Sequence, residues 1–446
     1  MELLKARTDQ NRVSLVSRRL LVVLTLGLPF FIYSCIVYSY ALNVPFWDDY
    51  TVVVESTAEF VESSSLQERV DLLVSPHNAV PGVSGHIPLL TRGFFVAQYY
   101  VTGSINIKHA LLFANSGWLL TAVVLLLYLK LASDIQSLYL IPVPYILLSF
   151  AHWEAMDFIT AAMQMYWGNA LLPVLFFLCL TKGRDLFSVL IFAAALFESA
   201  GNLALYPLAA LYLFVERRWM SAVSFLLPAT ILLGVFFTIN PPQLGSPHSL
   251  PPVFWMIEYI VGFMGNLFSG GSYDLRPLTL LQRLIGTVLL LAGFYLVLRV
   301  PRCHFLKLGF LYVVFIAIMA AYANFTRPGG GSFTMVPRYS IFPLMGVVFA
   351  CGLFLAQMRH INKLWLSVWF LTVMSFWIQG LVVTQTPLTE NWESRSRYAR
   401  SFAQSESSTA LRYMFFNAEQ GAEILKKAKR TGVYDYLVVL KDRGNP

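Results

Sequence analysis

The sequence predicts an all-α polytopic membrane protein, and three observations support this prediction. Of the 446 residues, 57% are hydrophobic and 13% are charged, whereas a soluble domain has about 25% charged residues. The apolar residues form long unbroken runs, such as 20–42 and 110–131. A run of about 18 apolar residues can cross the hydrocarbon core of a bilayer as a helix. Soluble enzymes, nucleic-acid-binding domains and secreted disulfide scaffolds are therefore excluded.

About eleven hydrophobic segments follow one another along the chain. We expect transmembrane segments at 20–42, 108–131, 138–152, 165–181, 186–199, 203–215, 220–239, 280–298, 305–324, 339–357 and 364–385. The pair 186–199 and 203–215 is short for two full spans and is interrupted by Glu198, Gly201 and Asn202. This interruption predicts a re-entrant or broken pair, because irregular backbone at that depth is tolerated only against protein or a water-filled cavity.

The basic residues between the runs predict the orientation. With the N-terminus inside, the inside segments carry fifteen Lys and Arg and the short outside loops carry three. Membrane proteins show the same excess of basic residues on the cytoplasmic side. A first loop (43–107) and a C-terminal tail (386–446) then lie outside. The ten Lys and Arg of the tail would suit the inside, but long domains cross with little regard to charge. We therefore expect a transmembrane domain, 1–385, and a small soluble tail, with one helix, a glycine stop and a short strand.

The motif Phe46-Trp47-Asp48-Asp49-Tyr50 follows the first predicted span. A carboxylate near hydrocarbon is costly unless it is paired, solvated or used in function. One of the two Asp residues could act as a general base towards an acceptor hydroxyl, with its pKa raised by low local polarity. The alternative is an interfacial turn, because Asp is common at turns.

Two histidines lie further along the first outer loop. His77 and His86 could bind an acceptor or a phosphate, assist proton transfer, or simply be exposed loop residues. No two histidines stand four residues apart on a helix, so the sequence predicts no specific metal site, although His and Asp ligands are conceivable.

Two further polar clusters lie outside in this orientation. Glu154, Asp157 and Gln164 occur among aromatic residues, which is typical of a sugar site and also of an aromatic belt with ordinary loop residues. Arg327, Arg338 and Tyr339 stand at the ends of two spans. Arginines there could hold the phosphate of a lipid carrier by charge-assisted hydrogen bonds. The inner loops carry no nucleotide-binding pattern, so a donor used outside would be carried by a lipid.

The order of these features resembles the integral-membrane glycosyltransferases of the GT-C fold. The resemblance rests on the first span followed by a loop that opens with Trp47-Asp48-Asp49. His77-Asn78 and Gly85-His86-Ile87-Pro88 are similar to the His-Asn-x-His-Arg-Ile-Pro pattern of a bacterial branch that includes O-antigen-modifying glucosyltransferases of the GtrII kind. The chain departs from that pattern in the insertion 79–85 and in the lack of Arg after His86.

The resemblance implies a GT-C-like bundle in a bacterial inner membrane, with the site facing the periplasm. It implies a polyprenyl-phosphate-linked sugar as donor and a glycan, lipid-linked saccharide or protein as acceptor. Asp48 or Asp49 would be the base of an inverting displacement, with Asp49 slightly favoured. The remaining implied roles concern ligands. Arg338, then Arg327, with Tyr339, would bind the donor phosphate, and His77, His86, Glu154, Asp157 and Gln164 would bind sugar or acceptor. No cofactor is required, although a divalent metal is used by some members.

Two other functions remain open from the sequence. A transporter or flippase of lipid-linked saccharide is kept open by Glu198 and Asn202, which interrupt apolar runs. A transporter would be expected to show internal repeats and a polar path at mid-membrane, whereas the polar clusters here collect on one face. An outer-face acyltransferase would more naturally use a His inside an apolar run, and none of the runs has one in its middle.

Overall fold

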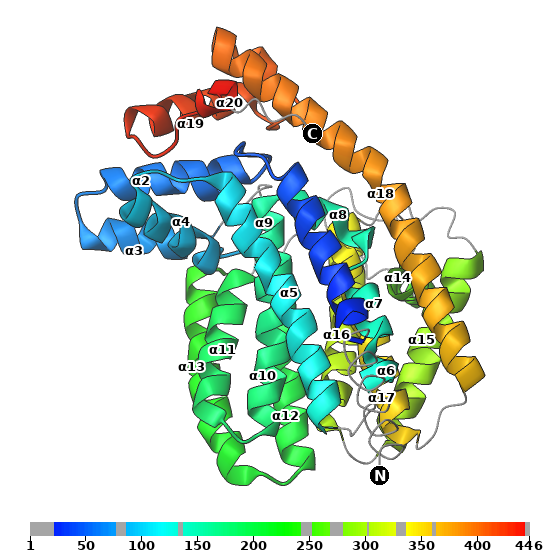
Figure 1. Ribbon diagram of the computed structural model, residues 1–446. Coiled ribbons are helices and arrows are strands. Elements are labelled where there is room, and N and C mark those ends of the chain that lie inside the picture. Colours follow the sequence, from blue (N-terminus) through cyan, green and yellow to red (C-terminus); the bar gives the residue numbers. More distant parts are fainter. Residues whose placement is uncertain are drawn as a thin grey trace, which may run out of the picture.

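The computed structural model describes residues 22–76, 86–132, 137–241, 252–267, 280–300, 303–326, 336–358 and 363–441. Within these ranges every regular element is a helix (Figure 1), which confirms the predicted all-α class. Eight helices of the described chain are long and apolar enough to cross a membrane, so the protein is an integral multi-pass membrane protein. These candidate spans are Val22–Tyr40, Ile107–Leu131, Ile159–Thr181, Trp219–Ile239, Leu280–Arg299, His304–Asn324, Pro337–Gln357 and Leu364–Ser405.

Three of the eleven expected segments do not form helices of that length. The segment 138–152 is divided into α6 (Ser137–Leu140), α7 (Pro142–Leu147) and η2 (Phe150–His152). Prolines explain this division, because Pro lacks an N–H donor and is tolerated only in the first turn of a helix. Pro142 accordingly begins α7.

The other two short segments form a broken helical pair, as the sequence predicts. Helix α11 (Asp185–Glu198) ends where expected, and η4 (Ala200–Ala204) connects it to α12 (Leu205–Val215). The start of α11 and the end of α12 lie close together, because Arg218 Nη2 is 3.8 Å from Asp185 Oδ1. The chain therefore returns to the end of the bundle from which it entered.

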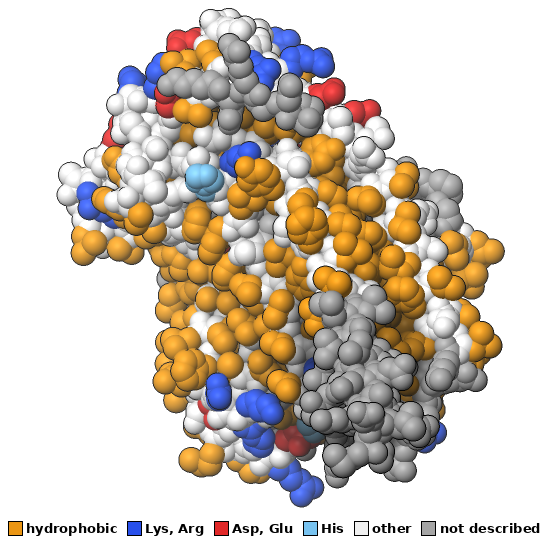
Figure 2. Space-filling model, in the orientation of Figure 1, with side chains coloured by type: hydrophobic (Ala, Val, Ile, Leu, Met, Phe, Trp, Pro, Cys, Tyr) orange, Lys and Arg blue, Asp and Glu red, His pale blue; other side chains and the backbone are white. Residues whose placement is uncertain are grey.

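The spans form an elongated bundle with a cap across one end (top of Figure 1). The cap contains α2 (Ser56–Glu62), α3 (Leu66–Val74) and α4 (Leu89–Thr102) from the first loop. Above these helices lie α19 (Ala418–Arg430) and α20 (Val438–Lys441) from the tail. Figure 2 shows hydrophobic side chains covering the sides of the bundle, with Lys and Arg near both ends. Such a band matches a helical bundle embedded in hydrocarbon.

Helix α18 (Lys363–Ser405) joins the bundle to the cap. It has 43 residues, so it is about 65 Å long, roughly twice the thickness of the hydrocarbon core. The expected boundary at 385 therefore falls within one continuous helix. In the tail, α19 ends at Arg430 and Gly432 follows with φ +72°, which confirms the helix and its glycine stop. The predicted strand is wrong: Val438–Lys441 forms a helical turn against α18, with no strand among the described residues to pair with.

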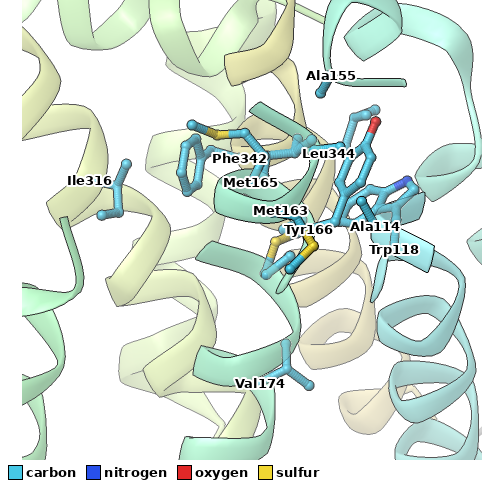
Figure 3. Close-up of a cluster of buried hydrophobic side chains, with 14 of the residues drawn as sticks. Ala114, Trp118, Ala155, Met163, Met165, Tyr166, Val174, Ile316, Phe342 and Leu344 are labelled. Atoms are coloured by element: carbon cyan, nitrogen blue, oxygen red, sulfur yellow. The ribbon is translucent and has the colours of Figure 1, made fainter. Parts of the chain in front are cut away.

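A buried apolar cluster lies within the bundle (Figure 3). It is formed by α5 (Ile107–Ala132), η3 (Met163–Leu171), α10 (Leu172–Thr181), α16 (His304–Thr326) and α17 (Ile341–Gln357). Trp118 is fully buried and its indole N–H donates to the Leu147 carbonyl oxygen at 2.8 Å. This packing fixes the position of the short helices 150–162, which carry much of the candidate site.

Candidate functional site

The site begins with the tight turn that follows the first span. Trp47 has φ +49°, a conformation that is strained for a bulky side chain and persists only where the surroundings hold it. The backbone N–H of Trp47 donates to the Met414 carbonyl oxygen at 2.8 Å, and Tyr50 N–H donates to the Trp47 carbonyl oxygen at 3.2 Å. The tail therefore holds the turn that carries the two predicted catalytic carboxylates.

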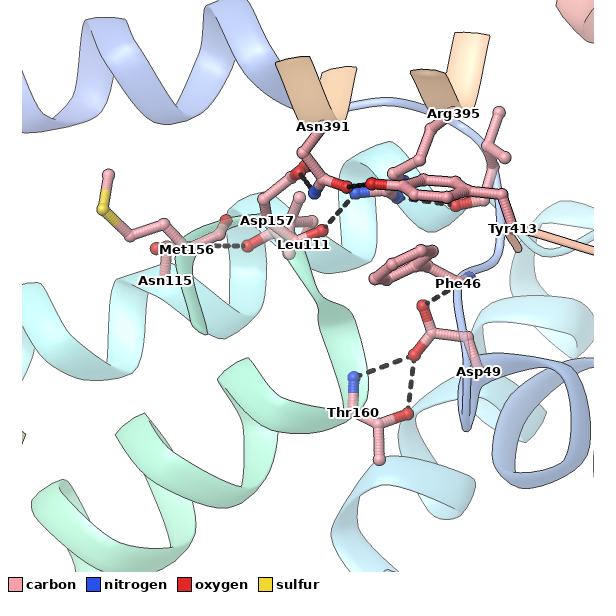
Figure 4. Close-up of polar contacts among 11 residues, drawn as sticks. Phe46, Asp49, Leu111, Asn115, Met156, Asp157, Thr160, Asn391, Arg395 and Tyr413 are labelled. Carbon is pink, nitrogen blue, oxygen red and sulfur yellow. Dashed lines mark hydrogen bonds and ion pairs between the residues drawn. The ribbon is translucent and has the colours of Figure 1, made fainter. Parts of the chain in front are cut away.

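Asp49 is fully buried and both of its oxygens accept hydrogen bonds (Figure 4). Oδ1 accepts from the Thr160 backbone N–H at 3.0 Å and from the Thr160 hydroxyl at 2.6 Å. Oδ2 accepts from the Phe46 N–H at 3.1 Å. Burial raises the pKa of Asp49 to about 7, although the bonds from Thr160 and the charge of Arg395 favour the ionised form. Asp49 thus connects the first loop to α9 (Ile159–Ala162).

Asp48 differs from its neighbour because it is half-buried. Its charge acts on Arg338, whose Nη1 lies 2.8 Å from Glu154 Oε1. The Arg338 and Glu154 side chains are 27% and 16% exposed, so both are accessible. The guanidinium carbon of Arg338 also lies 5.6 Å from the centre of the Tyr339 ring. Asp48, Glu154, Arg338 and Tyr339 thus come from three separate segments and gather near one another.

Buried polar atoms without a hydrogen-bond partner lie on the segments around Arg338. They are Trp153 Nε1, Glu154 Oε2 and Ser340 Oγ. Residues 153–157 form α8, which packs against η5 (Pro337–Ser340). A buried polar group without a partner costs about 1–3 kcal/mol, so these atoms are unfavourable for folding alone and mark α8 and η5 as a candidate place for function.

Asp157 is buried and is held by the tail (Figure 4). Arg395 Nη1 lies 2.8 Å from Asp157 Oδ1, and Asn391 Nδ2 donates to Asp157 Oδ2 at 2.7 Å. Arg395 Nη2 also donates to the Val44 carbonyl oxygen at 3.0 Å. Sequence reasoning missed Arg395, Asn391 and Thr160. No local signal could have found the first two, because they lie more than 230 residues from Asp157.

The remaining predicted residues are less closely connected to this site. Gln164 is half-buried on η3. His86 lies just before α4, whose first turn is held by Glu198 through the Leu90 N–H at 2.9 Å and the Thr91 hydroxyl at 2.6 Å. His77 and Arg327 lie outside the described residues.

Within the part of the chain that the structure describes, no three His, Cys, Asp or Glu side chains come together as a metal site requires. Comparisons with protein families, with curated proteins and with solved structures find no match for this chain. The chemical capacity of the site follows from its geometry. It combines a half-buried carboxylate, a nearby guanidinium and several buried polar atoms without a partner, at the cap end of a membrane bundle.

Proposed function

We propose that the protein is a membrane glycosyltransferase of GT-C type that uses a polyprenyl-phosphate-linked sugar. The acceptor is a glycan, a lipid-linked saccharide or a protein. The proposal is supported by the ion pair between Arg338 and Glu154, 2.8 Å apart, with Asp48 close enough to act electrostatically on Arg338. In the proposal, Asp48 supplies the general base and Arg338 the cation that binds the phosphate. The resemblance of the Trp47-Asp48-Asp49 loop to GT-C enzymes gives further support.

Asp48 is the base in this proposal. Both oxygens of Asp49 accept hydrogen bonds from Thr160 and Phe46, whereas Asp48 is half-buried and accessible. Asp48 accepts the proton of an acceptor hydroxyl, the acceptor oxygen attacks the anomeric carbon of the sugar, and the bond from that carbon to the lipid phosphate breaks. Arg338 stabilises the negative charge on the leaving phosphate.

Glu154 has two roles in the proposed site. One of its oxygens, Oε1, holds the Arg338 guanidinium at 2.8 Å. The other, Oε2, is buried without a partner and accepts a hydrogen bond from a sugar hydroxyl. Tyr339 and Phe158 flank the guanidinium at 5.6 Å and 6.0 Å and limit its movement.

The cap faces the outside of the membrane in this proposal, which corresponds to the periplasm of a bacterial inner membrane. Basic turns at the opposite end of the bundle support this orientation. They include Lys182 and Arg184 between α10 and α11, and Arg217 and Arg218 before α13 (Trp219–Ile239). A lipid-linked donor reaches such a site from the bilayer itself.

The transport alternative depends on Glu198 and Asn202. Glu198 accepts hydrogen bonds from Leu90 and Thr91. Asn202 donates to the carbonyl oxygens of Gly168 and Ala195, at 2.9 Å and 2.8 Å, and accepts from the Tyr312 hydroxyl at 2.8 Å. These side chains hold helices together, which favours transfer over transport.

The proposal is tested with purified full-length protein, synthetic polyprenyl-phosphate hexoses and pentoses, and an envelope glycan extract as acceptor. We expect sugar transfer by the wild type and a loss of about 10²–10⁴-fold in Asp48→Asn, with the melting temperature retained. Asp71→Asn on α3 is the matched control, because Asp71 is an exposed carboxylate of the same loop. Full activity in Asp48→Asn would show that Asp48 is not the general base. Movement of a fluorescent lipid-linked saccharide across vesicles, without transfer from any donor, would instead identify a flippase.

A further inference from the structure

A row of aromatic rings joins the first loop to the tail beside Asp48. We call it the aromatic ledge, and it consists of Trp47, Phe46, Tyr413 and Tyr398. The ring centroids of Trp47 and Phe46 are 6.0 Å apart, and those of Phe46 and Tyr413 are 6.1 Å apart. Tyr413 and Tyr398 are stacked at 5.3 Å. Trp47 is 49% exposed and Tyr413 is 42% exposed, so the ledge presents aromatic surface to its surroundings.

Hydrogen bonds hold the Trp47 backbone and the Tyr413 ring in place. Trp47 donates its backbone N–H to the Met414 carbonyl oxygen. The Tyr413 hydroxyl donates to Asn391 Oδ1 at 3.2 Å, and Asn391 in turn binds Asp157. A hydrogen-bond chain therefore connects the exposed Tyr413 ring to the buried ion pair. A ring held in this way, as Tyr413 is, loses little conformational entropy when it binds a ligand.

Exposure of the ledge residues does not stabilise the fold. An exposed Trp contributes less to stability than a buried one, and the positive φ of Trp47 adds strain. Burial in the hydrocarbon core of a bilayer does not explain the exposure either, because exposed charged side chains occupy the same stretches of the tail. Examples are Glu390, Glu393, Arg397 and Arg412, and charge is costly in a membrane.

A saccharide matches the chemistry of the ledge. Aromatic surface with a few placed polar groups is typical of ligand sites, and the apolar C–H face of a pyranose can lie on a ring while its hydroxyls bind nearby amides and hydroxyls. Asn391 and the Tyr413 hydroxyl supply such groups. Asp48 directly follows Trp47 in the chain, so the ledge and the proposed base lie on the same turn.

We propose that the aromatic ledge binds the sugar residues of a saccharide acceptor, so that the C-terminal tail forms half of the acceptor site. The naming of this ligand as the acceptor rests on the proposed glycosyltransferase function. Binding of sugar by the ledge does not depend on it. Among the three acceptor classes left open above, the ledge therefore selects a glycan or a lipid-linked saccharide over a protein.

Binding is tested without any donor, by saturation-transfer NMR on the full chain in detergent. The probes are methyl glycosides of glucose, galactose, mannose, rhamnose and N-acetylglucosamine. We expect saturation transfer to the ring protons of at least one glycoside with the wild type, and a reduction of about tenfold in affinity in Trp47→Ala and Tyr413→Ala. Trp47→Tyr keeps an aromatic ring and should retain binding. Tyr100→Ala is the control, because Tyr100 is 60% exposed on α4 and lies outside the ledge.

The outcomes separate the two proposals. No saturation transfer to any glycoside, or equal transfer in wild type, Trp47→Ala and Tyr413→Ala, overturns the ledge proposal. Where transfer activity is measurable, Trp47→Ala should raise the KM for acceptor about tenfold and leave the KM for donor unchanged. An unchanged acceptor KM overturns the acceptor assignment. Binding of glycoside that depends on Trp47, without any sugar transfer, supports the ledge and counts against the glycosyltransferase.

Discussion

Asp157 and Arg395 form a buried ion pair, with 2.8 Å between Oδ1 and Nη1 and side chains 2% and 1% exposed. The same guanidinium donates to the Val44 carbonyl oxygen and lies 5.0 Å from the centre of the Phe46 ring. One residue of the tail thus contacts both the short helix that carries Asp157 and the chain just before the Asp48-Asp49 turn. Arg395 therefore holds the tail, the first loop and the short helix of Asp157 together.

Replacement of Arg395 should destabilise the protein strongly. Arg395→Ala leaves the Asp157 carboxylate buried without its counter-charge, and loss of one partner of a buried pair costs about 3–5 kcal/mol. We expect a clearly lower melting temperature in detergent and weaker function at the candidate site. Arg397→Ala is the matched control, because Arg397 is exposed on the same helix. Similar melting temperatures for Arg395→Ala and Arg397→Ala would show that the pair contributes little.

Stability should fall with rising pH because of Asp49. Burial raises its pKa in the folded protein to about 7, whereas its pKa in the unfolded chain is about 3.9. Between these values the folded state binds more protons than the unfolded state, so the free energy of unfolding decreases as pH rises from about 4 to about 7. In Asp49→Asn this contribution is absent, and the melting temperature should depend less steeply on pH. Equal pH dependence of the melting temperature in the wild type and Asp49→Asn would show that Asp49 does not cause the loss of stability.

The close crossing of two helices supplies a test of the bundle. Gly286 on α15 (Leu280–Arg299) faces α14 (Val253–Gly265), and a Cβ at Gly286 would collide with the Val261 carbonyl oxygen. Small residues allow such approaches in membranes. Gly286→Ala should therefore lower the melting temperature, whereas Gly234→Ala, which would meet nothing within 4 Å, should leave it unchanged. Equal effects of the two substitutions would argue against this packing.

Much of the fold could be predicted from local patterns. Long apolar runs indicate spans, and the polar interruption at Glu198 and Asn202 indicates the break that η4 forms. The end of α18 could not be predicted in this way, because apolar composition stops near 385 while the helix continues to Ser405. The strand expected near Val438 was wrong for a related reason: neighbouring valines favour a strand locally, but contacts with α18 determine a helical turn instead.

The candidate site, too, could be predicted only in part. The charged candidates could be identified from the sequence because a charge near an apolar run requires a reason. They are the carboxylates at 48, 49, 154 and 157 and the guanidinium at 338. Their catalytic and binding roles stay predictions. The residues that bind Asp49 and Asp157 could not be identified from the sequence. Thr160 and Arg395 are ordinary residues in their local sequence, and only the folded chain brings them to the carboxylates.

Attachment of the tail beyond α18 to the first loop should depend on apolar packing more than on the exposed ion pairs of Lys427. The rings of Tyr50 and Phe415 are stacked at 4.9 Å and are each 1% exposed. Lys427 forms ion pairs with Glu59 and Glu62 at 3.3 Å and 3.4 Å, but these side chains are 29–50% exposed. A buried Phe→Ala change costs about 3–5 kcal/mol, whereas an exposed ion pair contributes about 0–1 kcal/mol and is screened by salt.

Phe415→Ala should therefore release the tail from the first loop, and Lys427→Ala should not. Limited digestion with thermolysin measures this release, because cleavage requires a locally opened chain. We expect rapid cleavage after residue 405 in Phe415→Ala, and cleavage at the wild-type rate in Lys427→Ala at high salt. Release of the tail also removes the Met414 carbonyl oxygen that holds Trp47, so Phe415→Ala should disturb the Asp48-Asp49 turn without touching it. Protection of the chain after residue 405 in Phe415→Ala, or its loss in Lys427→Ala, would show that the Lys427 ion pairs rather than ring packing hold this part of the tail.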